Sequence, residues 1–291
     1  MDIKKITIRR AAGGGTPTLL STDEWSDDKK TRTVTDFDTN GAAVHKQVNR
    51  YDGSDRLILR EDSYLKENIS TAVKSEYGNM IKIDREYFLD GGNTKTVTVF
   101  DKEGHVLSIE KFDDEDPSSF SGAVYNEYDD KGLLKASRIE NSERNITESA
   151  TYTYDAQGRD IRTDKVSLGI KSFKEKFYDD KGRLVRVSSN GGNSPEEEGK
   201  AEIKYNEDDG SREEIIEQAG AVIIQRFNAD NVMTYQERRE QFNLKKAGAL
   251  KISYDFDEGG LLRSVILQDD SNPLNSYTNR YEYEFFGENN G

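Results

Sequence analysis

The chain of 291 residues contains no cysteine, two histidines and four prolines. Without cysteine there is no disulfide framework, no thiolate zinc site and no cysteine nucleophile, and two histidines exclude a histidine-rich metal site. Most familiar catalytic constellations are therefore missing. We expect a protein that is not an enzyme and that uses no metal ion and no cofactor.

Long apolar runs are also absent. No stretch approaches the roughly 18 uninterrupted apolar residues of a transmembrane helix. The first ten residues alternate apolar side chains with charges and lack the apolar segment of a signal peptide. We therefore expect no membrane association and favour a cytoplasmic location.

Basic residues are fewer than acidic residues. The chain has 42 Lys and Arg against 56 Asp and Glu, which gives a formal net charge of −14 at pH 7. Such a balance argues against unassisted binding to nucleic acid or to anionic membranes. A protein partner is expected instead, basic rather than acidic, and the chain is compatible with self-assembly.

A short pattern does recur: an aromatic residue, Asp or Asn, two or three polar residues, and Gly. Three copies are nearly identical and begin at Tyr128, Tyr154 and Tyr178. Looser or degenerate copies begin at Phe37, Tyr51, Tyr77, Phe100, Tyr205, Phe227 and Tyr254, the last with two inserted residues. The spacing is about 25 residues apart from a first step of 14. We predict a repeat array over 35–291, preceded by an N-terminal strand and flexible lead-in over 1–34, with residues 13–17 as its flexible connection.

Each repeat has the pattern of a β-hairpin. Asp at the first turn position can cap backbone N–H groups, and Gly at the fourth can take a left-handed conformation. The pattern predicts turns at 38–41, 101–104, 129–132, 155–158, 179–182 and 255–260. Gly132, Gly158 and Gly182 are then expected at positive φ. The flanks alternate with period two and predict strands; only 213–217 and 235–250 are ambiguous with helix.

The predicted fold class is all-β, with tandem hairpins joined into one continuous curled antiparallel meander of roughly twenty strands. Because each strand pair twists by about 20 to 25°, the sheet is expected to curl into a spiral, an open cylinder or a closed cylinder. Equivalent tyrosines on every second strand would form an aromatic ladder that serves as the core. The return connections, such as 189–199, are irregular in length.

The tyrosine-aspartate pattern with a trailing Gly-Arg resembles the YD repeat of the Rhs family, most closely at Tyr154–Arg159 and Tyr178–Leu184. The resemblance implies a curved β-sheet shell or scaffold from bacteria, in a toxin-delivery setting or at a cell surface. The family's core segment with a self-cleavage site and its C-terminal toxin domain are not found. Roughly twenty strands are also too few to surround a folded domain unaided, so encapsulation is not expected of this chain alone.

Several motifs have a plainer interpretation than catalysis or metal binding. Residues 36–41 imitate the start of a calcium loop, but position 12 is Gln47, so a hairpin turn is preferred. Adjacent acids in the turns fit solvated turns better than acid–base pairs. His105 follows a turn glycine and is expected on a strand surface. Trp25 precedes the predicted array and is expected to cap its open edge; the alternative is an aromatic residue that binds a ligand.

We predict a non-enzymatic scaffold that binds a macromolecular partner, in a toxin-delivery or toxin-neutralising setting. The alternatives are a carrier of an apolar ligand inside a β-barrel and a cell-surface protein that binds or acts on glycans. Arginines after the turns are expected to pair with turn aspartates of neighbouring repeats, or to form a stripe for an acidic ligand. The candidate partner-binding residues are Asp129, Asp130, Asp179, Asp180, Arg159 and Arg183.

Overall fold

The computed structural model describes residues 2–12, 15–88, 92–114, 116, 118–190, 199–218, 220–240, 249–269 and 272–286. In these ranges the chain is almost entirely β-strand, as predicted, with one short 3₁₀ helix, η1 (Pro273–Asn275). None of the helices in the described ranges has the length and apolar character to cross a membrane. The predictions for residues 13–14, 191–198 and 241–248 lie outside the described residues.

The strands follow one another along the whole chain. In chain order they are β1 (Ile3–Ala12), β2 (Thr18–Trp25), β3 (Thr31–Phe37), β4 (Ala43–Tyr51), β5 (Leu57–Tyr64), β6 (Ile69–Tyr77), β7 (Ile81–Phe88), β8 (Thr94–Phe100), β9 (Val106–Asp113), β10 (Phe120–Tyr128), β11 (Leu134–Asn141), β12 (Ile146–Tyr154), β13 (Asp160–Ser167), β14 (Ile170–Tyr178), β15 (Leu184–Asn190), β16 (Gly199–Tyr205), β17 (Arg212–Gln218), β18 (Ala221–Phe227), β19 (Met233–Glu240), β20 (Ala249–Phe256), β21 (Leu262–Asp269) and β22 (Tyr277–Phe285). The described parts of both helix-ambiguous segments, 213–217 and 235–250, are strands.

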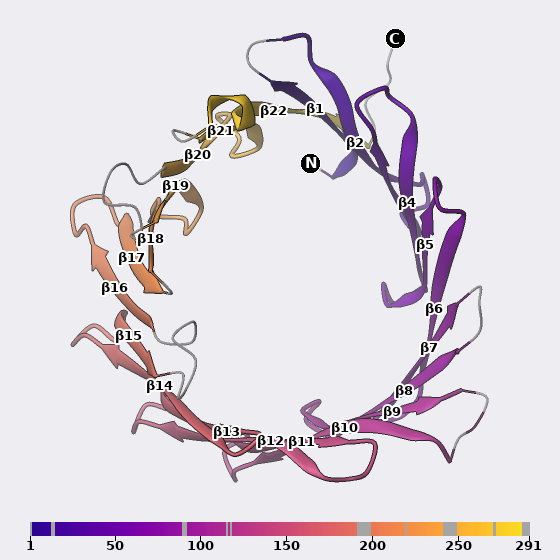
Figure 1. Ribbon diagram of the computed structural model, residues 1–291, viewed down its shortest axis with the longest axis vertical. Helices are drawn as coiled ribbons and strands as arrows, with labels where there is room; N and C mark the ends of the chain where they lie inside the picture. The colour runs from indigo at the N-terminus through magenta and orange to yellow at the C-terminus, as the bar shows by residue number, and fades with distance from the viewer. Residues whose placement is uncertain are drawn as a thin grey trace.

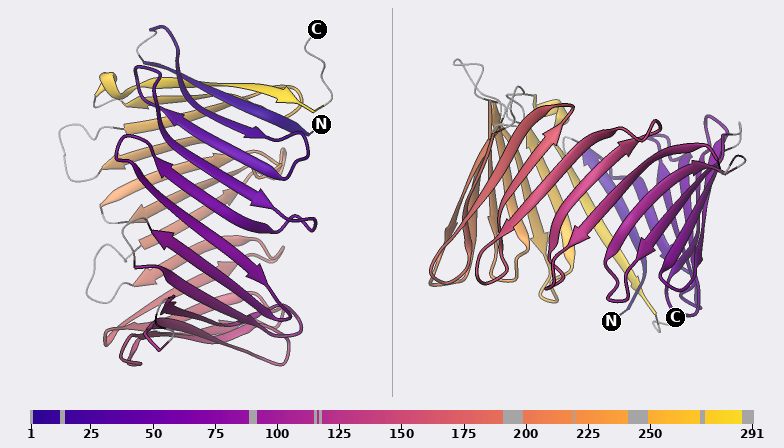
Figure 2. Two further views of the ribbon diagram at one scale, coloured as in Figure 1. Left: turned by 90° about the vertical axis from the view of Figure 1, so that its right-hand side faces the viewer. Right: turned by 90° about the horizontal axis from the view of Figure 1, so that it is seen from below.

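Consecutive strands pair antiparallel all the way around, and the last strand then pairs with the first. β22 meets β1 along nine residue pairs, from Ile3 with Phe285 to Ala12 with Tyr277. The sheet of 22 strands is therefore a closed cylinder, which decides among the three shapes that the sequence left open. Figure 1 looks along the axis of this ring of strands, and Figure 2 shows that the strands are tilted. The start of β1 and the end of β22 lie at the same end, since Ile3 pairs with Phe285.

The cylinder wall is a single layer. Among the described residues, no large side chain is fully buried. The accessible surface is 18614 Å², about half again the ~12,500 Å² expected for a compact monomer of this mass. Stability must therefore come from cross-strand pairs and local side-chain contacts on the sheet faces rather than from a core between two layers.

Because strand direction alternates, successive turns lie at opposite ends of the cylinder. We call the end that carries the repeat turns the YD rim. Its ten turns are 26–30, 52–56, 78–80, 101–105, 129–133, 155–159, 179–183, 206–211, 228–232 and 257–261. The turn after Phe37 joins β3 to β4 and lies at the other end, so its assignment to the repeat series is wrong. This explains the irregular first step of 14.

The series instead starts at Trp25. The Ser26 hydroxyl accepts the Thr31 N–H at 2.9 Å, and Lys29 takes the left-handed position at φ 56°. Trp25 packs on Tyr51 with ring centroids 5.3 Å apart, at the first of the repeat positions. Because β2 lies between β1 and β3, Trp25 does not cap a sheet edge, and that prediction is wrong.

The predicted turn geometry is confirmed. Gly132, Gly158 and Gly182 have φ values of 78°, 77° and 80°. The last turn begins later than predicted, since Gly260 donates its N–H to the Asp257 carbonyl at 3.0 Å. Its aromatic residue is therefore Phe256 rather than Tyr254, and no insertion is needed.

Candidate functional site

Where a repeat turn begins with aspartate, the carboxylate holds the backbone of that turn. One carboxylate oxygen of Asp179 accepts the N–H groups of Lys181 and Arg183, at 3.0 and 2.8 Å. Asp129 does the same with Lys131 and Leu133, at 2.9 Å each. The hydrogen bond from the Arg183 backbone lowers the pKa of Asp179 below its usual range, so this cap is present at neutral pH and is lost on acidification.

The repeat tyrosine ties its hairpin to the preceding one. In six repeats the tyrosine hydroxyl donates to the carbonyl of the residue that opens the strand after the preceding repeat turn. The pairs are Tyr77 with Leu57, Tyr128 with Val106, Tyr154 with Leu134, Tyr178 with Asp160, Tyr205 with Leu184 and Tyr283 with Leu262, at 2.8 to 3.1 Å. Tyr283 is thus the eleventh aromatic of the series that starts at Trp25.

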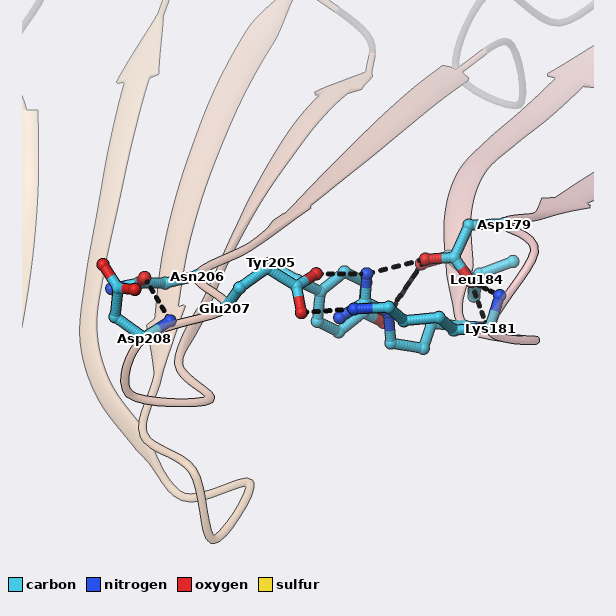
Figure 3. Close-up of polar contacts among 8 residues, drawn as sticks. Asp179, Lys181, Leu184, Tyr205, Asn206, Glu207 and Asp208 are labelled. Carbon is cyan, nitrogen blue, oxygen red and sulfur yellow. Dashed lines mark hydrogen bonds and ion pairs between the residues drawn. The ribbon is translucent and has the colours of Figure 1, made fainter.

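The arginine after the turn closes the same contact. Arg183 donates to Asp179 at 2.8 Å, and its guanidinium lies 4.3 Å from the ring centroid of Tyr205 in the next repeat. It also meets Glu207 at 2.7 Å, which Lys181 contacts as well (Figure 3). We call this unit of turn aspartate, following cation and next tyrosine the clasp.

Arg159 forms an equivalent clasp. It donates to Asp155 at 2.6 Å and lies 4.6 Å from the ring centroid of Tyr178. The arginines therefore pair with the aspartate of their own turn and cover the neighbour's tyrosine, so the predicted pairing with aspartates of neighbouring repeats is wrong. The next repeat places its aromatic ring against the guanidinium, and the acid of the next turn that Arg183 also reaches is Glu207 rather than an aspartate.

His105 makes the same two contacts with an imidazole ring in place of a guanidinium. Its Nδ1 lies 2.8 Å from an Asp101 carboxylate oxygen, and its ring stacks on Tyr128 at 4.7 Å. Residue spacing could have shown this, because His105 occupies the position of Arg159 after its turn glycine. The sequence offered no sign of the cross-repeat tyrosine bond, since its acceptor is a backbone carbonyl.

The clasp separates the six candidate residues into two groups. Asp129, Asp179, Arg159 and Arg183 are partly buried and engaged within the sheet, whereas Asp130 and Asp180 are exposed at the second position of their turns. Of the six, these last two are the ones whose carboxylates are exposed to solvent.

The densest negative charge on the YD rim lies elsewhere on the ring. Three consecutive repeat turns, 206–211, 228–232 and 257–261, carry formal charges of −3, −1 and −2, while the other seven together carry −3. We call these three turns the acidic arc. Its acids are Glu207, Asp208, Asp209, Asp230, Asp257 and Glu258, all of them exposed.

The clasp leads to a stability prediction. Tyr154→Phe keeps the ring but removes the hydrogen bond to the Leu134 carbonyl, so we expect a loss of about 1 kcal/mol in the free energy of unfolding. Urea denaturation measures it. Tyr152→Phe is the matched control, because the Tyr152 hydroxyl meets Ser137 at the long distance of 3.4 Å. Equal losses in the two variants would contradict a special role for the repeat hydroxyl.

No family model matches the sequence, and no curated protein is significantly similar to it. Among solved structures, the chain is similar to a porin-like protein from Bacteroides uniformis, with 8% identity over 97% of this chain and 98% of that chain and a TM-score of 0.36. A porin-like protein from Bacteroides vulgatus matches with 9% identity, 99% and 100% coverage and a TM-score of 0.26.

Another neighbour is TcdB2-TccC3 without its hypervariable C-terminal region, with 11% identity and a TM-score of 0.34. That match covers 91% of this chain but 20% of the other, so the chain spans about a fifth of that neighbour. Function therefore has to follow from this chain's own residues.

Proposed function

We propose that this protein is a non-enzymatic scaffold that binds a basic macromolecular partner on its YD rim. The observation that carries the proposal is the acidic arc, where three adjacent turns of one continuous sheet have six exposed acids. Glu207 already pairs with Lys181 and Arg183, and the other five extend the negative charge along the rim. Clustered charge of one sign raises the association rate of an oppositely charged partner.

The single-layer architecture supports binding as the role. Folding leaves 18614 Å² of surface accessible, so the chain has ample area for a partner of ordinary interface size, about 800 Å² on each side. Side-chain caps hold turns of the acidic arc: the Asn228 side chain accepts the Val232 N–H at 2.9 Å, and Asp257 accepts the N–H groups of Gly259 and Leu261 at 2.8 and 2.9 Å. Turns that are already ordered lose less entropy when a partner binds.

Binding is a better role than catalysis for these turns because the turn aspartates already have structural partners. Asp129 and Asp179 accept backbone N–H groups, and Asp155 holds Arg159. A carboxylate occupied in this way is a poor general base. The setting that we propose, toxin delivery or toxin neutralisation in bacteria, rests on the YD-like repeats of the sequence.

The test measures how the association rate of a partner recovered by pull-down depends on salt and on the charge of the YD rim. Between about 50 and 500 mM salt, we expect the association rate to fall by roughly tenfold or more. Changing Asp130, Asp180, Asp208 and Asp209 to asparagine should lower the rate at low salt and flatten the salt dependence. Surface plasmon resonance measures both.

Glu67→Gln with Glu143→Gln is the matched control, because both acids are exposed in turns at the opposite end of the cylinder. This pair should leave association unchanged. If the association rate changes neither with salt nor when the four acids are neutralised, the YD rim is not the partner surface. If no protein is recovered and the purified chain turns over a glycan, the scaffold role itself is wrong.

A further inference from the structure

A groove of about 350 Å³ crosses four strands near the end of the cylinder opposite the YD rim. Its volume falls in the range of about 300 to 1,000 Å³ that small-molecule sites occupy. The lining residues come from β4 to β7: Lys46, Val48, Glu61, Ser63, Ser70, Thr71, Ala72, Tyr87 and Phe88.

Strand register shows which of these side chains share one face. Lys46 pairs with Ser63, which pairs with Ser70, and these three form one row across the sheet. Glu61 pairs with Ala72, which pairs with Tyr87, in the adjacent row. Directly opposed residues project from the same face, so both rows line the groove together. This face is the one away from the repeat tyrosines, because Ala72 and Tyr77 have opposite parity in β6.

The floor and walls differ in size and chemistry. Ser63, Ser70 and Ala72 are small side chains, and they line the part of the groove that β5 and β6 form. Tyr87, 38% exposed, stands on one side as a ring with an accessible face. Lys46 and Glu61 stand toward the other side and contribute one charge of each sign.

We propose that this groove binds a carbohydrate. The two opposite charges cancel, so the groove favours neither an anion nor a cation, while hydroxyls and charged groups supply donors and acceptors for a polyhydroxylated ligand. An aromatic ring with an accessible face packs against the apolar C–H face of a sugar ring. An apolar ligand would leave the serine hydroxyls, Lys46 and Glu61 without polar partners on the ligand.

The probes are neutral hexasaccharides: cellohexaose, maltohexaose and N-acetylchitohexaose. We expect saturation-transfer NMR to detect binding of at least one of them, with a dissociation constant of about 0.1 to 1 mM as suits a shallow groove. Tyr87→Ala should weaken binding about 5- to 10-fold, and Tyr87→Phe should keep most of it, because the ring face makes the contact.

Ser70→Val gives a second, independent variant that replaces a floor hydroxyl with methyl groups and should also weaken binding. Tyr64→Ala is the control, because Tyr64 is 48% exposed but lies on the opposite face of β5 from Ser63. It should bind as the unaltered chain does. Absence of binding by all three hexasaccharides at about 10 mM, or equal binding by Tyr87→Ala and the unaltered chain, would overturn the proposal.

Discussion

Deleting residues 2–16 should open the cylinder and lower the free energy of unfolding by about 5 kcal/mol or more. β1 makes nine residue pairs with β22 and six with β2, so its loss removes the ladders on both sides. It also removes Arg10, which donates to Asn279 at 2.9 Å and lies 3.9 Å from the Tyr277 ring centroid.

The opened sheet would have two unpaired edges, β2 and β22, each able to pair with another chain. We therefore expect the truncated protein to form dimers and larger species in sedimentation velocity, together with a lower urea midpoint. This experiment also tests whether the first residues are a lead-in, as the sequence suggested, or an integral part of the sheet.

Ile8→Pro provides a point change with the same logic, because Ile8 pairs with Tyr281 on one side and Ser21 on the other. Proline cannot donate to the ladder and should destabilise strongly, whereas the control Ile8→Val should cost little. A truncated chain that stays monomeric with an unchanged midpoint would mean that β1 contributes nothing to closure.

Gly132→Val should destabilise by about 2 to 3 kcal/mol. Gly132 has a φ of 78°, a conformation that β-branched residues rarely adopt. A Cβ there would also lie 3.0 Å from Cε1 of His105, the clasp residue of the preceding repeat. Backbone strain and a steric contact therefore act together, and urea denaturation measures their sum.

Gly41→Val separates the two effects, because Gly41 has a φ of 80° and a Cβ added to it would meet no atom of the described residues within 4 Å. It should cost about 1 to 2 kcal/mol from the backbone alone. Removing the contact with His105→Ala should recover part of the Gly132→Val loss. Equal losses of stability at positions 41 and 132 would show that the His105 side chain moves aside without penalty. No loss at either position would contradict the turn geometry.

The all-β class, the repeat period and the conformation of the turns could all be predicted from the order of the residues. These are local properties: Asp129 reaches N–H groups two and four residues ahead, and Gly132 takes a left-handed φ without a Cβ clash. Alternation of apolar and polar residues within one strand is equally local. Side chains and neighbours a few residues apart therefore carry enough information to predict these features.

Tertiary structure decided three features. They are the start of the series, the closure of the sheet, and the contacts that the arginines and His105 make after the turns. Trp25 is not followed by a turn glycine, so the repeat pattern does not identify it. The Tyr154 hydroxyl donates to a backbone carbonyl 20 residues earlier, and no side-chain pattern predicts that acceptor. Closure depends on Ile3 to Ala12 meeting a strand that begins at Tyr277. The sum of twists over 22 strands sets whether these ends meet, and small differences in each pair accumulate around the ring.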